Sequence, residues 1–208
     1  MPYVLRIDSS SRHAESHSRR LADRIEARLL SGASGLDVRR RDLSDDPVPH
    51  ISDETIAGFY TPPGAMTPQA RDATALSDAL IEELKGADTL LLSAPMYNFG
   101  VPSALKAWID QVVRINETFA YDESGFSGLV PVRRAFVATA YGAAGYGQGG
   151  AFAAMNFLDP YLVSLLTFLG IQDVRVIRVE STTADEDSVA GAWAAADRAI
   201  ADAFPAAA

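Results

Sequence analysis

The sequence predicts an α/β fold, a three-layer sandwich in which one parallel five-stranded sheet is covered by helices on both faces. Apolar segments of strand length alternate with segments of helical periodicity along the chain. The third and fourth strand segments are almost wholly apolar, whereas the second and fifth carry charges between apolar residues. Because central parallel strands are buried on both faces, we expect the charged segments at the two edges of the sheet.

The predicted strands span residues 3–7, 36–43, 89–93, 133–140 and 173–180. A strand order of 2-1-3-4-5 places the two charged strands at the edges. In this order the first and third strands are neighbours, and open α/β sheets bind ligands at the carboxyl ends of such a pair. The length of the chain suits one well-buried core, so we expect residues 1–208 to form a single domain.

Segments of helical periodicity separate the strands. In the first, Leu21, Ile25 and Leu29 recur at four-residue spacing. A second helix, 67–86, opens with a threonine cap and a first-turn proline. Its expected apolar face comprises Leu76, Leu80, Ile81 and Leu84. Further helices are expected from Pro102, over 159–169, and over the last part of the chain from Val189 to Phe204.

Composition excludes several functions. The formal net charge is −9 and no basic tract forms a stripe, so nucleic acid is not an expected partner. Cysteine is absent, which rules out disulfides and thiolate metal sites, and no other metal site is expected. No apolar run approaches the roughly twenty residues of a membrane span. The chain begins with a strand and not with a signal segment, so we expect a cytoplasmic protein without a membrane partner.

Hydroxyl groups are dense where the first strand leads into the first helix. Ser10, Ser16, His17 and Ser18 lie in this stretch, and Arg12 adds a positive charge. A helix amino terminus presents unpaired N–H groups that bind phosphate, although Ser16 or Ser18 could equally be an ordinary helix cap. The sequence therefore predicts a phosphate site here. Arg19 and Arg20, which follow in the chain, are expected on the solvated face of the helix and not in this site.

Aromatic and amide side chains follow the third strand. The turn consists of Pro95, Met96, Tyr97, Asn98 and Phe99. Its N–H groups and the Asn98 amide could bind the polar edge of a flat ring, although the aromatics could also merely close the core. A phosphate site beside such a turn suits a mononucleotide with a planar head group, and FMN fits that description.

Small residues follow the fourth strand. Ala140, Tyr141, Gly142 and Ala143 would let the backbone approach a ring closely. Gly145, Gly147 and Gly150 also match G-x-G-x-x-G, the fingerprint of dinucleotide binding. However, the match lies outside the first βαβ unit, where that fingerprint belongs. We interpret the segment as a flexible third wall of the site, and a plain surface loop is the alternative for residues 148–150.

Taken together, these motifs resemble those of the FMN-dependent NADH-azoreductases, in the flavodoxin-like NAD(P)H:quinone oxidoreductase superfamily. The resemblance covers nearly the whole chain and is carried by the serine-rich first loop, residues 94–99 followed by Leu105 and Lys106, residues 118–121, 125–129, 160–162 and 168–171. One departure is Ala140, where the family often has a serine.

The resemblance implies a tightly bound, non-covalent FMN that contacts the thirteen residues named above in the three loops: Ser10, Ser16, His17, Ser18, Pro95, Met96, Tyr97, Asn98, Phe99, Ala140, Tyr141, Gly142 and Ala143. It implies NADH or NADPH as co-substrate and ping-pong two-electron transfer to azo compounds or quinones. The flavin carries the chemistry, so no catalytic side chain is expected. It also implies a homodimer with FMN near the interface, in which Phe119, Tyr121 and Phe168 line the substrate side, some of them from a partner subunit.

Two alternatives remain. The chain could be an FMN-binding electron carrier or regulatory flavoprotein without turnover of small substrates. Segments 44–67 and 116–131 exceed what a minimal sheet of this kind needs, which favours an enzyme with a substrate cavity. The second alternative is a dehydrogenase that binds its dinucleotide at residues 145–150.

Overall fold

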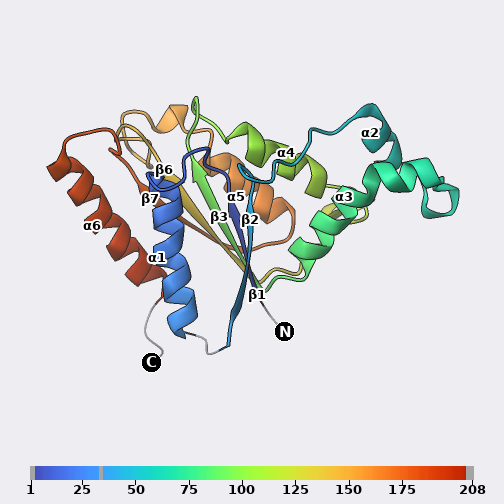
Figure 1. Ribbon diagram of the computed structural model, residues 1–208, viewed down its shortest axis with the longest axis horizontal. Coiled ribbons are helices and arrows are strands. Elements are labelled where there is room, and N and C mark those ends of the chain that lie inside the picture. The colour runs from blue at the N-terminus through green and yellow to red at the C-terminus, as the bar shows by residue number, and fades with distance from the viewer. Residues whose placement is uncertain (1–2, 33–34, 205–208) are drawn as a thin grey trace.

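A five-stranded parallel sheet runs through the centre of the computed structural model, which describes residues 3–32 and 35–204 (Figure 1). The strand order is β2-β1-β3-β6-β7, so the predicted order and the predicted edge strands are confirmed. All neighbouring strands are parallel. The five strands are β1 (Tyr3–Asp8), β2 (Asp37–Asp42), β3 (Thr89–Pro95), β6 (Arg134–Ala140) and β7 (Asp173–Val179).

Helices cover both faces of the sheet. One face packs against α1 (His17–Gly32) and α6 (Glu186–Ala203). The other face packs against α3 (Pro68–Lys85), α4 (Ser103–Val112) and α5 (Asp159–Phe168). Figure 1 shows α1 and α6 on the left of the sheet and α3 and α4 on its right. This arrangement leaves the carboxyl ends of β1, β3 and β6 together at one edge.

Strand periodicity divides the core between the two faces. On β1, Val4 packs toward α1 and α6, whereas Leu5 and Ile7 pack toward α3 and α4. Leu21 and Ile25 of α1 are fully buried, as their spacing predicts. Each fully buried leucine or isoleucine contributes about 1.5–3 kcal/mol to stability, so these faces hold the layers together.

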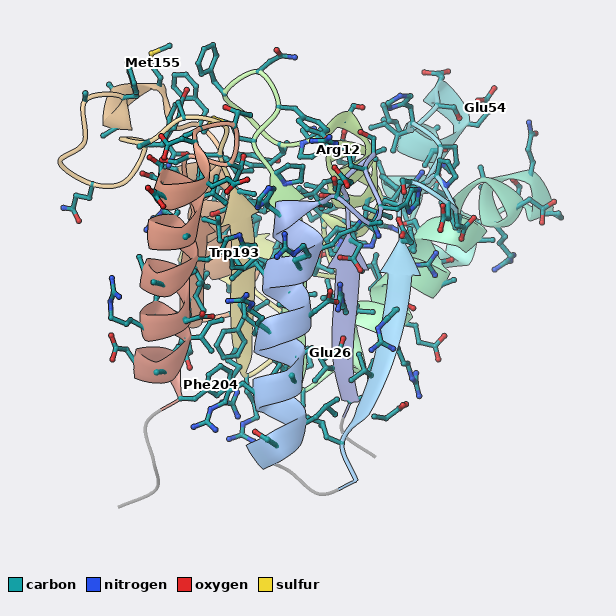
Figure 2. All side chains as sticks on the ribbon, turned by 60° about the vertical axis from the view of Figure 1, so that its left-hand side comes forward. Arg12, Glu26, Glu54, Met155, Trp193 and Phe204 are labelled. Carbon is teal, nitrogen blue, oxygen red and sulfur yellow. The ribbon has the colours of Figure 1, made fainter. Side chains whose placement is uncertain are left out.

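Arg6 is a charged residue inside this core. It is 5% exposed and donates to Asp8 through Nε at 2.9 Å and to Glu26 through Nη1 at 3.1 Å. Glu26 lies midway along α1, on the side of the helix next to β1 (Figure 2). Buried charges are tolerated when they are paired in this way. The network ties α1 to the end of β1, directly below the serine-rich loop.

Local signals set the ends of α3 as predicted. Thr67 Oγ1 accepts the Ala70 N–H at 3.1 Å, Pro68 is the first helical residue, and Gly86 ends the helix. Leu80, Ile81 and Leu84 are buried. Leu76 is 38% exposed, so its predicted place on the apolar face is wrong. The buried stripe of the helix runs through Thr74, Ser77, Leu80, Ile81 and Leu84, and Leu76 lies outside it.

The two long segments contain elements that the sequence pattern did not predict. Segment 44–67 holds the helix α2 (Asp53–Phe59) and the 3-10 turn η1 (Pro63–Ala65). Segment 116–131 holds an antiparallel hairpin of β4 (Phe119–Asp122) and β5 (Gly125–Gly128). A further 3-10 turn, η2 (Ala153–Met155), precedes α5. Across the described residues, none of the helices has the length and apolar character needed to span a bilayer.

Candidate functional site

A cavity of about 150 Å³ lies where the loops after β1, β3 and β6 meet. It also receives Thr182, which follows β7. Most of the predicted cofactor residues line it: Ser10, Ser16, His17, Ser18, Pro95, Met96, Tyr97, Ala140 and Gly142. Arg12 and Glu15 complete the lining, and Arg12 lies above the sheet beside the start of α1 (Figure 2). The parallel strands thus bring three separate loops to one place.

The serine end of the cavity is built from hydrogen-bond donors. The Ser16 and Ser18 hydroxyls are 3.2 Å apart, and Ser16 Oγ accepts the Arg19 N–H at 3.4 Å. The first N–H groups of α1 have no partners within the helix, as in any helix, and they carry its partial positive charge. His17 Nδ1 is buried without a hydrogen-bond partner among the described residues. This set of donors fits a phosphate group.

His17 is held in place by aromatic packing. Its ring stacks on Trp193 of α6, with the ring centroids 5.8 Å apart, and Trp193 lies between α1 and α6 (Figure 2). Burial lowers the pKa of His17, and the positive charges of Arg20 and Arg12 lower it further. The imidazole is therefore neutral at pH 7 and offers a hydrogen bond in place of a fixed charge.

The turn after β3 has an unusual backbone. Asn98 and Phe99 both adopt the left-handed conformation, with φ of 48° and 69°. The turn is closed by two hydrogen bonds of 3.1 Å between Tyr97 and Gly100. Non-glycine residues rarely adopt this conformation, and it is often found at binding sites. The tight turn points Pro95, Met96 and Tyr97 into the cavity.

Asn98 and Phe99 do not line this cavity. Asn98 instead borders a neighbouring cavity of about 650 Å³ together with Tyr97, His50, Lys106 and Tyr161. Phe99 is 40% exposed and lies outside both cavities. No pattern in the sequence predicts that His50 lies here. It lies far from the other residues in the chain, and only the packing of the segment after β2 brings it close.

The Tyr141 side chain also lies outside the cavity. It is 1% exposed, and its hydroxyl donates to Asp159 at the start of α5. Asn156 donates to the Tyr141 hydroxyl at 3.4 Å and to Asp159 Oδ2 at 3.1 Å. Burial raises the pKa of Tyr141, and the neighbouring Asp159 carboxylate raises it further. The Tyr141 N–H donates to the Val179 carbonyl and the Tyr141 carbonyl accepts the Thr182 N–H, so these backbone groups are also bound within the protein.

The glycine-rich segment binds a carboxylate of the chain itself. The N–H groups of Gly145, Tyr146 and Gly147 donate to Glu180 at 2.9, 3.1 and 2.9 Å. Successive backbone N–H groups of this kind form an anion-binding nest. Because Glu180 fills the nest, the segment has no free N–H groups there for a pyrophosphate, which argues against the dehydrogenase alternative. Ala143 is exposed and does not line the cavity.

The three predicted substrate residues form an aromatic cluster elsewhere. Phe119 and Phe168 have ring centroids 4.9 Å apart, and Tyr121 contacts Phe126 with centroids 4.6 Å apart. Phe168 is the last residue of α5, whereas Tyr141 contacts its first residue. None of the three predicted residues is among those that line the cavity after β1, β3 and β6. Within one chain these residues do not line the cofactor site.

Comparison with known proteins gives consistent matches along the chain. The family model described as "Flavodoxin-like fold" matches residues 3–203. The FMN-dependent NADH:quinone oxidoreductase of Xanthobacter autotrophicus is 54% identical over 176 residues, which cover 85% of each chain. The protein of the same name from Hydrogenovibrio crunogenus is 42% identical and covers 91% of this chain and 93% of its own.

Solved structures agree on the fold. An FMN-dependent NADH-azoreductase from Bacillus anthracis, solved in complex with FMN, superposes with a TM-score of 0.84. The superposition covers 99% of this chain and 100% of that chain, at 22% identity. An azoreductase from Bacillus anthracis strain Sterne gives a TM-score of 0.87 at 23% identity and covers 98% and 99% of the two chains. At this identity the likeness concerns the fold.

Proposed function

The chain belongs to the family with the flavodoxin-like fold, and from this premise we propose that it is an FMN-dependent NADH oxidoreductase that reduces quinones and azo compounds. The observation that carries the proposal is the relative that is 54% identical over 85% of both chains and is named an FMN-dependent NADH:quinone oxidoreductase. The cavity at the sheet edge supports it independently, because its donors suit the phosphate of FMN.

Different residues of the cavity would hold different parts of FMN. The Ser10, Ser16 and Ser18 hydroxyls and the first N–H groups of α1 would hold the phosphate. Residues 95–97, Ala140 and Gly142 would flank the ring system, whereas Asn98 and Phe99 would lie on the outer side of the turn. When bound, FMN supplies two-electron transfer between NADH or NADPH and the acceptor. The chain's own task is to orient the two flat molecules and to exclude water.

We also propose that two chains assemble into a homodimer with FMN near the interface. The hairpin exposes aromatic surface, with Tyr121 62% and Phe126 65% exposed. Phe157, beside the turn after β3, is 63% exposed. Exposed apolar patches of this kind favour protein contacts. A partner subunit would bring Phe119, Tyr121 or Phe168 to a cofactor site that they do not reach within their own chain.

The oligomeric state tests this arrangement directly. We expect the wild-type chain to elute as a dimer at micromolar concentration, and Phe126→Glu to elute as a monomer that retains its secondary structure. Leu30→Glu is the matched control, because Leu30 is 40% exposed on α1, away from the hairpin. A wild-type protein that is monomeric with FMN bound would contradict the proposal. The cytoplasmic location stays a prediction that cell fractionation can test.

Steady-state turnover separates the enzyme from an electron carrier. The purified full chain should show a flavin spectrum, and the released chromophore should have the mass of FMN. We expect sustained NADH oxidation with menadione or methyl red as acceptor. A flavin spectrum without turnover would favour the carrier, and a colourless protein that does not bind added FMN would overturn the proposed function.

A further inference from the structure

Arg19 joins the serine-rich loop to the edge of the sheet. Its Nη2 donates to the Ser10 carbonyl at 2.7 Å, to Asp42 Oδ1 at 2.7 Å and to the Ser44 hydroxyl at 3.0 Å. Its Nη1 donates to Asp42 Oδ2. The side chain is 12% exposed, so the prediction that it lies on the solvated helix face is wrong. Arg19 reaches sideways from α1 to the end of β2.

The partner carboxylate is itself fixed. Asp42 is the last residue of β2 and stands opposite Asp8, the last residue of β1. Asp42 Oδ1 also accepts the Ser44 N–H at 3.0 Å and the Ser44 hydroxyl at 2.9 Å. The Arg19 hydrogen bond holds the pKa of Asp42 well below its usual range. The pair is therefore charged at neutral pH and anchored to the sheet.

This geometry separates the role of Arg19 from that of Arg12. Both oxygens of Asp42 are bound to the Arg19 guanidinium, so its charge is neutralised within the protein. Arg12 is exposed and lines the cavity. A phosphate in the cavity would meet Arg12, whereas Arg19 would act on it only through the backbone of Ser10.

The contact with Ser10 orients the loop. Because the peptide group is planar and trans, holding the Ser10 carbonyl toward Arg19 points the following N–H in the opposite direction. The Ser10 hydroxyl lines the cavity and accepts the Arg12 N–H at 3.2 Å. None of the Arg19 side-chain contacts reaches the turn after β3 or the loop after β6. Its effect is confined to the serine end of the site.

We propose that Arg19 is a positioning residue that makes this site select FMN over riboflavin, by holding the Ser10 backbone in the shape that receives a phosphate. The inference rests on the proposed function, because it takes FMN as the ligand. Riboflavin has the same ring system without the phosphate, so the ratio of the two dissociation constants isolates the serine end of the site.

Flavin titration of the flavin-free full chain tests the proposal, with fluorescence quenching as the readout. In Arg19→Lys the charge remains but the fork that joins Asp42, Ser44 and Ser10 is lost. We expect the misplaced Ser10 backbone to lose one charge-assisted hydrogen bond to the phosphate, so the Kd for FMN should rise at least about tenfold. Riboflavin has no phosphate, so its Kd should change less than about twofold. Arg28→Gln is the matched control: it removes an exposed positive charge from the same helix at a residue that does not line the cavity, and its Kd ratio should stay near that of the wild type.

Two outcomes would overturn the inference. One is unchanged FMN binding in Arg19→Lys, and the other is an equal rise of both dissociation constants, which would mean general damage to the fold. If Arg19→Lys fails to fold, Asp42→Asn provides the second variant, because it removes the anchor and keeps Arg19, and the same selective loss of FMN is expected. A wild-type chain that binds neither flavin would instead refute the proposed function.

Discussion

The Tyr97 hydroxyl lies 2.9 Å from the Ser11 hydroxyl, although the two residues are 86 positions apart in the chain. The contact joins the turn after β3 to the loop after β1, the two segments that form most of the cavity. Burial acts to raise the pKa of Tyr97, but hydrogen bonds with Ser11 and Ser10 outweigh it and lower the pKa. The bond therefore joins the serine-rich loop to the turn after β3 beside the cavity.

Removing this bond should loosen the site without unfolding the protein. In Tyr97→Phe we expect the Kd for FMN to rise about two- to tenfold, the equivalent of one neutral hydrogen bond of about 0.5–1.5 kcal/mol. Flavin fluorescence titration measures the change. Ser11→Ala removes the other half of the same bond and should give a similar effect. Opposite effects of the two variants would show that the bond does not join the loops in solution.

A carboxylate at position 16 should repel the phosphate of FMN. Ser16 lines the cavity at the start of α1, and two like charges about 4 Å apart cost about 1–4 kcal/mol depending on the local dielectric. We therefore expect Ser16→Asp to weaken FMN binding at least about fivefold. Ser16→Asn has the same size without the charge and serves as the control. Equal affinity in Ser16→Asp and the wild type would remove Ser16 from the site.

His17 should make the flavin-free protein less stable in acid. Burial, with Arg20 and Arg12, lowers its pKa in the folded protein, whereas the unfolded chain keeps the ordinary value of 6.5. Below pH 6.5 the unfolded state therefore binds more protons, and stability falls as the pH drops toward the lowered pKa. Well above pH 6.5 His17 is neutral in both the folded and the unfolded state, so its titration costs no stability there.

The pH dependence of thermal unfolding measures this effect. Tm is measured between about pH 7.5 and about pH 5, a range that spans the ordinary histidine pKa. We expect Tm to fall less over this range in His17→Gln than in the wild type. His50→Gln is the control, since His50 is exposed. Loss of the Trp193 contact shifts the Tm of the variant at every pH, so the slope of Tm against pH is the readout. A slope equal to that of the wild type would contradict the prediction.

Tyr141 should matter for stability and not for the cofactor. Tyr141→Phe removes a donor from Asp159, which is 3% exposed, and should lower the free energy of unfolding by about 1–3 kcal/mol. Urea unfolding measures the loss. Tyr60→Phe, at a tyrosine that is 74% exposed, should change stability by less than about 0.5 kcal/mol. FMN affinity should stay within about twofold, and a selective loss of FMN would place the Tyr141 side chain in the site.

Local patterns were sufficient to predict the fold and the first loop. Charged residues in β2 and β7 marked the sheet edges, because only edge strands leave such side chains in contact with water. The hydroxyls of Ser10, Ser16 and Ser18 could be placed together because a parallel strand delivers its following loop to one edge of the sheet. Both inferences use periodicity and neighbours in the sequence.

Contacts between segments that are distant in the chain could not be predicted from these local patterns. The direction of the Tyr141 side chain depends on Asp159, and the partner of Arg19 is Asp42, on another strand. The hairpin at 119–128 was missed because its strands have four residues each, too few for a clear alternation.

The sequence by itself determined the sheet, its edges and the position of the serine-rich loop, since these follow from which residues avoid water and which begin a helix. Only the tertiary structure decided which side chains face the cavity. A side chain's direction depends on the partners available around it, as Glu180 in the nest of Gly145–Gly147 shows, and those partners come from parts of the chain that folding alone brings together.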